Sequence, residues 1–127
     1  EKVVELATEL LAPAAPENAR AAVVFLHGLD SWRGTFRTIA KTLVRLGIAS
    51  LLIDLRGHGE SPLGDPEDFS GRQLAIDVRN AVLTTPFLDG IDNLVLLGHS
   101  IGGRIALQCA AEDPGLFNSL VLVDIDC

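Results

Sequence analysis

The sequence has few cysteines, no long apolar run and no secretion signal. Its two cysteines, Cys109 and Cys127, suggest neither a disulfide framework nor a metal site. A reducing compartment, the cytoplasm or an organelle interior, is therefore favoured. No apolar run approaches the roughly 18 residues of a transmembrane helix, and no basic segment followed by a short apolar one marks a signal peptide. The chain begins at Glu1 rather than Met, so targeting sequences are not visible here.

The sequence also lacks clustered positive charge. Ten Lys and Arg residues are scattered among 17 Asp and Glu residues, which gives a formal net charge of -7. Phosphate binding needs clustered Lys and Arg, so nucleic acid is not expected as a partner. The length of 127 residues fits a single domain, and the mean hydropathy of +0.34 indicates a buried sheet.

Four short apolar segments are typical of buried strands. They are nearly continuous in Val, Leu, Ile and Ala, which predicts burial on both faces of a parallel sheet covered by helices. The segments are Ala21–His27, Ala49–Asp54, Leu94–His99 and Ser119–Ile125. Val3–Leu11 is a weaker candidate, because Glu and Thr interrupt it.

Helical periodicity fills the gaps between these segments. Apolar residues recur at helical spacing within Phe36–Val44, Leu74–Val82 and Ile101–Ala111. Alternating strands and helices predict an α/β fold, a mostly parallel sheet with helices on both faces. The Gly-, Pro- and Asp-rich stretch Arg56–Ser70 indicates a surface loop.

The most informative motif surrounds Ser100. The residues GHSIGG, Gly98 to Gly103, match G-x-S-x-G between an apolar strand and a helix, the context of a nucleophile elbow. Such a turn forces the serine into strained backbone angles, and side chains at Gly98 and Gly102 would clash across it. Ser100 is therefore the candidate nucleophile; the alternative is a serine that only caps the helix.

Two backbone amides are candidate donors for an oxyanion. The Ile101 N–H lies at a helix N-terminus, where amides lack partners and carry partial positive charge. One such donor contributes roughly 3–4 kcal/mol in the transition state. The Leu29 N–H is the second candidate, because Gly28 lets the backbone turn back over the sheet. The His27 side chain is interpreted as structural, hydrogen-bonded to this loop.

A second glycine-rich turn, DLRGHGES, follows the segment Ala49–Asp54. It has no G-x-G-x-x-G spacing at the start of a helix and is therefore not a dinucleotide fingerprint. We interpret it as a structural turn, which Asp54 and Arg56 anchor through hydrogen bonds, rather than as catalytic.

In this order, HGL, DLRGHGES, GHSIGG and LVLVDI resemble the α/β-hydrolase superfamily, in particular the small serine esterases and acyl hydrolases of its abhydrolase-domain branch. The resemblance implies an eight-stranded, mostly parallel sheet with Ser100 as nucleophile after the fifth strand. It implies oxyanion amides at Leu29 and Ile101 and no cofactor. Residues 1–127 are then the N-terminal portion of a single α/β-hydrolase domain, which stops after about the sixth strand.

The departure from the family is the missing histidine. The family orders its triad Ser, then Asp or Glu, then His, but no histidine follows Ser100. We therefore expect the catalytic histidine outside this chain and little activity from the chain alone. His27 is a weak internal candidate for the base. Asp124 and Asp126 are weak candidates for an acid that orients a histidine; the alternative is that both are strand-end loop acids.

Two hypotheses follow from these residues. The first is a serine hydrolase that acts on ester or thioester substrates through an acyl-enzyme at Ser100. The second is a non-catalytic structural subunit of a larger assembly. In either case the Ser119–Ile125 segment forms an apolar edge, and further sequence or another chain is expected against it.

Overall fold

The computed structural model describes residues 3–124, which are built around one five-stranded sheet. Its strands are β1 (Thr8–Leu11), β2 (Ala21–Leu26), β3 (Ala49–Ile53), β4 (Asn93–His99) and β5 (Ser119–Val123). Their spatial order is β1-β3-β2-β4-β5. Only β1 runs antiparallel to its neighbour, and the three other pairs are parallel. The expectation of a mostly parallel sheet is confirmed, and the weak first candidate is a short antiparallel edge strand.

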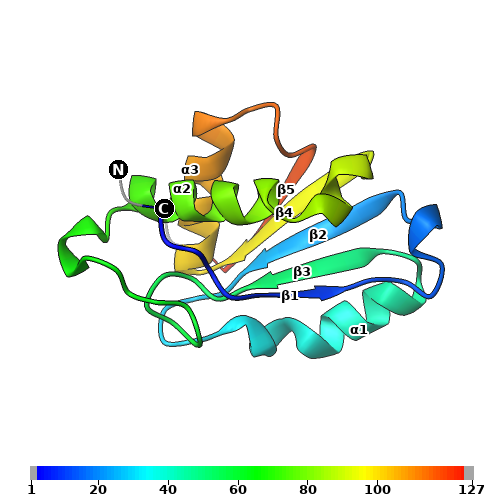
Figure 1. Cartoon of the computed structure of the whole chain (residues 1–127), viewed down its shortest axis with the longest axis horizontal. Helices are drawn as coiled ribbons and strands as arrows, with labels where there is room; N and C mark the ends of the chain where they lie inside the picture. The colour runs from blue at the N-terminus through cyan, green and yellow to red at the C-terminus, as the bar shows by residue number, and fades with distance from the viewer. Residues whose placement is uncertain (1–2, 125–127) are drawn as a thin grey trace.

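The helices lie on both faces of the sheet, as expected. They are α1 (Arg37–Arg45), α2 (Gly71–Leu83) and α3 (Ile101–Glu112), with short 3-10 turns η1 (Pro16–Asn18), η2 (Arg33–Phe36), η3 (Pro66–Asp68) and η4 (Pro86–Gly90). Figure 1 shows α1 on one face and α2 and α3 on the other. None of the helices between residues 3 and 124 is both long and apolar enough to cross a bilayer.

The larger core lies between the sheet and the helices α2 and α3. Leu26, Leu51 and Val78 are fully buried there, and Ile105 is nearly so. Burying a side chain of this size stabilises the fold by roughly 1.5–3 kcal/mol. A smaller core of Phe25, Ala40 and Leu52 lies on the face that α1 covers. The two cores hold the carboxyl ends of β2, β3 and β4 in place.

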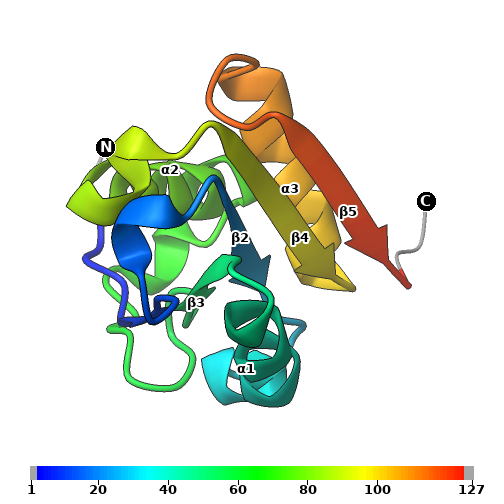
Figure 2. The ribbon, with the colours of Figure 1, turned by 90° about the vertical axis from the view of Figure 1, so that its right-hand side faces the viewer.

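Burial on both faces, expected for all four apolar segments, is found only at the centre of the sheet. Every residue of β3 is buried, whereas β4 alternates and β5 is largely exposed. Val121 and Val123 keep 42% and 41% of their surface exposed. These residues are exposed because no helix covers them on the face where α1 lies. There α1 packs chiefly on β3 and β1, whereas β5 lies at the opposite edge of the sheet (Figure 2).

The stretch after β3 is not a surface loop throughout. Arg56 is fully buried and pairs with the equally buried Asp77 of α2, with Nε–Oδ2 and Nη2–Oδ1 distances of 2.7 and 2.9 Å. The Asp77 carboxylate also accepts a hydrogen bond from the Val4 N–H at 3.1 Å. A charge is tolerated inside a protein when it is paired and hydrogen-bonded, so this arginine anchors the turn from within. The anchoring expected of Arg56 is confirmed.

Candidate active site

Ser100 lies at the junction between β4 and α3 in a strained conformation. Its φ of 58° and ψ of -121° lie outside the regions that non-glycine residues normally adopt. Such a residue costs about 1–3 kcal/mol and persists only where its surroundings enforce it. Here the Ser100 N–H donates to the Val123 carbonyl at 3.1 Å, and its own carbonyl accepts from Gly103 at 2.9 Å. The Ser100 side chain makes no capping hydrogen bond to α3, which argues against a simple helix cap.

The glycines around Ser100 lie where no side chain fits. A Cβ at Gly102 would lie 2.7 Å from the His27 carbonyl oxygen and closer still to that of Leu26. A Cβ at Gly98 would lie 2.6 Å from the Gly103 nitrogen and closer to the Gly102 carbonyl oxygen. The clash expected across this turn is therefore confirmed. Because Gly98 and Gly102 carry no side chain, the first turn of α3 packs directly against the end of β2.

A hollow of about 420 Å³ opens at this junction. It is lined by Leu29, Ser100, Ile101, Arg104 and Asp124. The fold therefore brings together the candidate nucleophile, both candidate oxyanion residues and one candidate acid, from three separate segments. Arg104 also lines the hollow and was not predicted from the sequence. Its spacing was an available signal, because residues four apart at a helix start share one face.

The Leu29 amide has a defined orientation. The Gly28 carbonyl accepts hydrogen bonds from His27 Nδ1 at 2.7 Å and from the Ser31 N–H at 3.2 Å. In a trans peptide the following N–H points opposite to the carbonyl. The bonds to the Gly28 oxygen therefore aim the Leu29 N–H away from His27. Gly28 is close to the serine as well, since a Cβ there would lie 3.3 Å from that of Ser100.

His27 is a structural residue in this arrangement. Its ring is fully buried, and Nε2 accepts a hydrogen bond from the Leu55 N–H at 3.0 Å. Because a carbonyl can only accept, Nδ1 carries the proton that is donated to Gly28. Burial lowers the pKa of His27, which favours this neutral form. Both nitrogens are committed to backbone groups, and this supports the structural interpretation over the role of a base.

The two other histidines and the candidate acids lie as follows. His99 Nε2 is 4.0 Å from an Asp124 carboxylate oxygen, and His99 also borders an apolar hollow beside α1. His58 Nδ1 lies 3.0 Å from the Arg56 carbonyl oxygen. Within residues 3–124, no hydrogen bond joins the Ser100 hydroxyl to a histidine, and no cluster of His, Cys, Asp or Glu is placed to hold a metal ion. Asp126 lies outside the described residues.

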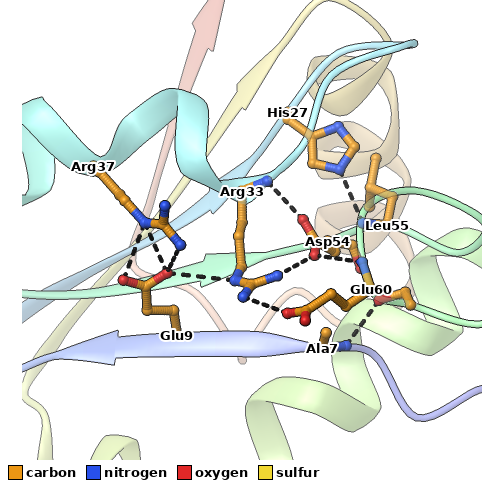
Figure 3. A network of polar contacts seen from close by, with 9 residues as sticks. Ala7, Glu9, His27, Arg33, Arg37, Asp54, Leu55 and Glu60 are labelled. Carbon is orange, nitrogen blue, oxygen red and sulfur yellow. Dashed lines mark hydrogen bonds and ion pairs between the residues drawn. The ribbon is translucent and has the colours of Figure 1, made fainter.

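Asp54 forms the centre of a polar network with Arg33 and Glu60 (Figure 3). Its fully buried carboxylate accepts hydrogen bonds from the Arg33 N–H at 2.6 Å and from the Glu60 N–H at 3.0 Å. The same carboxylate also pairs with the Arg33 guanidinium. Burial acts to raise the pKa of Asp54, but these backbone donors and the guanidinium outweigh it and lower the pKa. The anchoring expected of Asp54 is confirmed. No motif in the sequence marks Arg33 as its partner.

This geometry defines the class of protein. A central parallel strand that ends in a strained, glycine-flanked serine beside a hollow is the arrangement of an α/β hydrolase. Residues 17–124 match the family described as serine aminopeptidase, S33, and the chain belongs to this family of the α/β-hydrolase superfamily.

Named relatives support this assignment. An sn-1-specific diacylglycerol lipase (ABHD11) from Danio rerio is 42% identical over 107 residues, which cover 81% of this chain and 31% of the relative. Protein phosphatase methylesterase 1 from Homo sapiens is 36% identical over 101 residues, 78% of this chain and 25% of the relative. The chain thus spans about a third or less of the length of these relatives.

Solved structures agree on the fold. A marine microorganism esterase superposes with a TM-score of 0.77 at 25% identity, covering 94% of this chain and 41% of the esterase. A putative epoxide hydrolase mutant from Pseudomonas aeruginosa superposes with a TM-score of 0.79 at 23% identity, covering 99% and 39%. The second comparison bears on the fold alone.

Proposed function

We propose that the protein is a serine hydrolase that cleaves ester or thioester substrates through an acyl-enzyme on Ser100. One observation carries this proposal: a strained serine at the start of a helix faces a hollow that Leu29 and Ile101 also line. Relatives named as a diacylglycerol lipase and a methylesterase support an ester as the substrate class.

The reaction has two halves. In the first, the Ser100 oxygen attacks the substrate carbonyl carbon while a histidine accepts the hydroxyl proton. The carbonyl oxygen becomes an oxyanion that the Leu29 and Ile101 N–H groups stabilise. The leaving alcohol or thiol takes the proton from the histidine. In the second half, water attacks the acyl-enzyme by the same route, releases the carboxylic acid and restores the Ser100 hydroxyl.

The histidine is proposed to come from sequence outside these 127 residues. Both nitrogens of His27 are bound to backbone groups, and the chain spans about a third or less of its named relatives. Asp124, which lines the hollow beside Ser100, is this chain's candidate for the carboxylate that orients the histidine.

The exposed edge of β5 is the proposed docking position for further polypeptide. The strand pairs with β4, ends the described sheet and presents Val121 and Val123 to solvent. Unpaired edges of this kind invite strand pairing. We therefore expect residues 1–127, expressed alone, to associate or aggregate in size-exclusion chromatography with light scattering. A monodisperse 13.5 kDa monomer would refute this.

A fluorophosphonate probe tests the serine assignment in the full-length protein. We expect labelling of the wild type, none of Ser100→Ala, and normal labelling of Ser119→Ala, which removes an exposed serine at the far end of β5. Hydrolysis of p-nitrophenyl acetate should fall by at least about 10⁴-fold in Ser100→Ala. A folded wild type that neither labels nor hydrolyses the ester would favour the non-catalytic subunit.

A further inference from the structure

The loop that carries Leu29 is held at both ends by one short segment. At its start, His27 accepts a hydrogen bond from the Leu55 N–H at 3.0 Å. At its end, the Arg33 N–H donates to Asp54 at 2.6 Å, and the Arg33 guanidinium binds the same carboxylate. The two anchors, Asp54 and Leu55, are therefore consecutive residues directly after β3. A loop fixed at both ends to one short segment has little freedom to shift its amides.

The turn after β3 is shaped to present the Asp54 carboxylate. Gly59 has a φ of 53°, and a Cβ there would lie 2.6 Å from one carboxylate oxygen of Asp54 and closer to the other. Without that side chain, the Glu60 N–H reaches Asp54 at 3.0 Å. The Ser61 hydroxyl donates to the Asp54 carbonyl at 2.6 Å and accepts from the Ala7 N–H at 2.8 Å. The DLRGHGES turn thus braces Asp54 from behind.

Arg33 is tied into the same structure by its other nitrogens. Its Nη2 lies 2.6 Å from a Glu60 carboxylate oxygen, and its Nε lies 3.4 Å from Glu9 of β1. Glu9 in turn pairs with Arg37 of α1 at 2.8 Å. Figure 3 shows this chain of contacts running from α1 and β1 to the turn after β3. The Arg33 side chain is 12% exposed and that of Asp54 is fully buried, so solvent screens their pairing weakly.

We infer that Asp54 and Arg33 are positioning residues for the oxyanion donor of Leu29, acting through the loop between Gly28 and Arg33. This inference rests on the proposed function. An oxyanion hole works only when its donors lie within hydrogen-bond distance of the developing charge. Neither residue lines the hollow at Ser100, so their effect on the reaction passes through the Leu29 amide to the oxyanion of the transition state.

The expected effect on kcat follows from this indirect, positioning role. Removing a whole oxyanion donor lowers kcat by about 10²–10³-fold. A donor that is present but displaced should cost less, about 10–100-fold in kcat, with KM changed little. Asp54→Asn places an amide N–H₂ against the Arg33 and Glu60 donors and is the stronger perturbation. Arg33→Gln leaves both backbone bonds to Asp54 in place and should be the milder one.

Matched controls separate positioning from general damage. Arg20→Gln removes an arginine that precedes β2 and pairs with Asp92 on the surface, 3.4 Å apart and far from the turn after β3. Arg79→Gln removes an arginine that pairs with Asp113 on the surface, 2.9 Å apart and half exposed. Should Asp54→Asn fail to fold, Arg33→Gln against Arg79→Gln carries the test. Arg33→Lys, which keeps one cationic donor, should restore part of the loss.

The measurement is made on the full-length protein with p-nitrophenyl acetate and a trifluoromethyl ketone, whose hemiketal places an oxyanion in the same position. With rates normalised to folded protein, we expect kcat to fall and the ketone inhibition constant to rise by similar factors in Asp54→Asn and Arg33→Gln. The two controls should change neither quantity beyond about 3-fold. A lowered folded fraction alone would move neither normalised quantity.

Two results would overturn the inference. If kcat and the ketone constant stay at wild-type values in Asp54→Asn and Arg33→Gln while Ser100→Ala is inactive, the proposed function stands and the positioning role is wrong. If the wild type shows no Ser100-dependent hydrolysis, the proposed function fails and the inference fails with it.

Discussion

Gly102 is the position where a single methyl group should reverse the usual effect of replacing glycine in a helix. It lies in the first turn of α3, where alanine ordinarily stabilises a helix by up to about 1 kcal/mol. A Cβ at this position would lie 2.7 Å from the His27 carbonyl oxygen and nearer to that of Leu26. We therefore expect Gly102→Ala to destabilise the protein.

The magnitude follows from what would have to move. Carbon and oxygen approach to about 3.3–3.6 Å even in favourable C–H···O contacts, so α3 must retreat from β2 by several tenths of an ångström or more. Both neighbours are backbone atoms at the end of a hydrogen-bonded strand and cannot rotate away. Overpacking typically costs about 1–3 kcal/mol, and the rigid neighbours favour the upper part of that range. After subtraction of the helix gain, the free energy of unfolding should fall by about 2 kcal/mol.

Gly71→Ala is the matched control. Gly71 is the first residue of α2, and a Cβ there has open space within 4 Å. This substitution should leave stability unchanged or raise it by up to about 1 kcal/mol. Urea unfolding of the full-length variants, followed by far-UV circular dichroism, measures both. A Gly102→Ala protein as stable as Gly71→Ala would refute the close packing of α3 on β2.

Three further outcomes are expected. Ser100→Gly should raise the free energy of unfolding by roughly 1 kcal/mol in urea titrations, because glycine adopts the φ of 58° without strain. The same variant should not be labelled by the fluorophosphonate probe. A lower free energy of unfolding would contradict the proposed backbone strain at Ser100. Because burial lowers the pKa of His27, the unfolded chain binds a proton on this ring at higher pH than the folded chain does. The contribution of His27 to stability is therefore complete above about pH 6.5 and is lost as the pH falls from there through the folded-state pKa. His27→Gln should flatten this pH dependence of the free energy of unfolding between pH 7 and 5. An unchanged slope in the variant would contradict the lowered pKa of His27. Burial raises the pKa of the Cys109 thiol to about 12, so iodoacetamide at pH 8 should modify Cys109 only after denaturation, as peptide mass spectrometry can show; rapid alkylation of the native protein would contradict its burial.

Local patterns in the sequence were sufficient for the elements and for the turn at Ser100. The apolar segments and helical spacings predict β2, β3, β4 and the three α-helices to within a few residues, because side-chain periodicity reports burial directly. The first strand is shorter than expected and begins at Thr8 rather than Val3, and Ile125, the expected end of the last segment, lies outside the described residues. The G-x-S-x-G spacing between a strand and a helix predicts the strained serine, since only glycine leaves room for α3 to begin there. The structural role of His27 and the anchoring by Asp54 were predicted from the same strand ends.

Long-range packing decided what remained. The exposure of β5 depends on how far α1 reaches across the sheet, which no feature of β5 itself encodes. The partnership of Arg33 with Asp54 joins residues 21 positions apart, and Arg33 follows its loop without any distinguishing motif. The hollow collects Leu29, Ser100 and Asp124 only because β2, β4 and β5 run parallel and end at the same edge. Periodicity specifies which face of an element is apolar, whereas the contact between two distant polar groups exists only once the sheet has assembled.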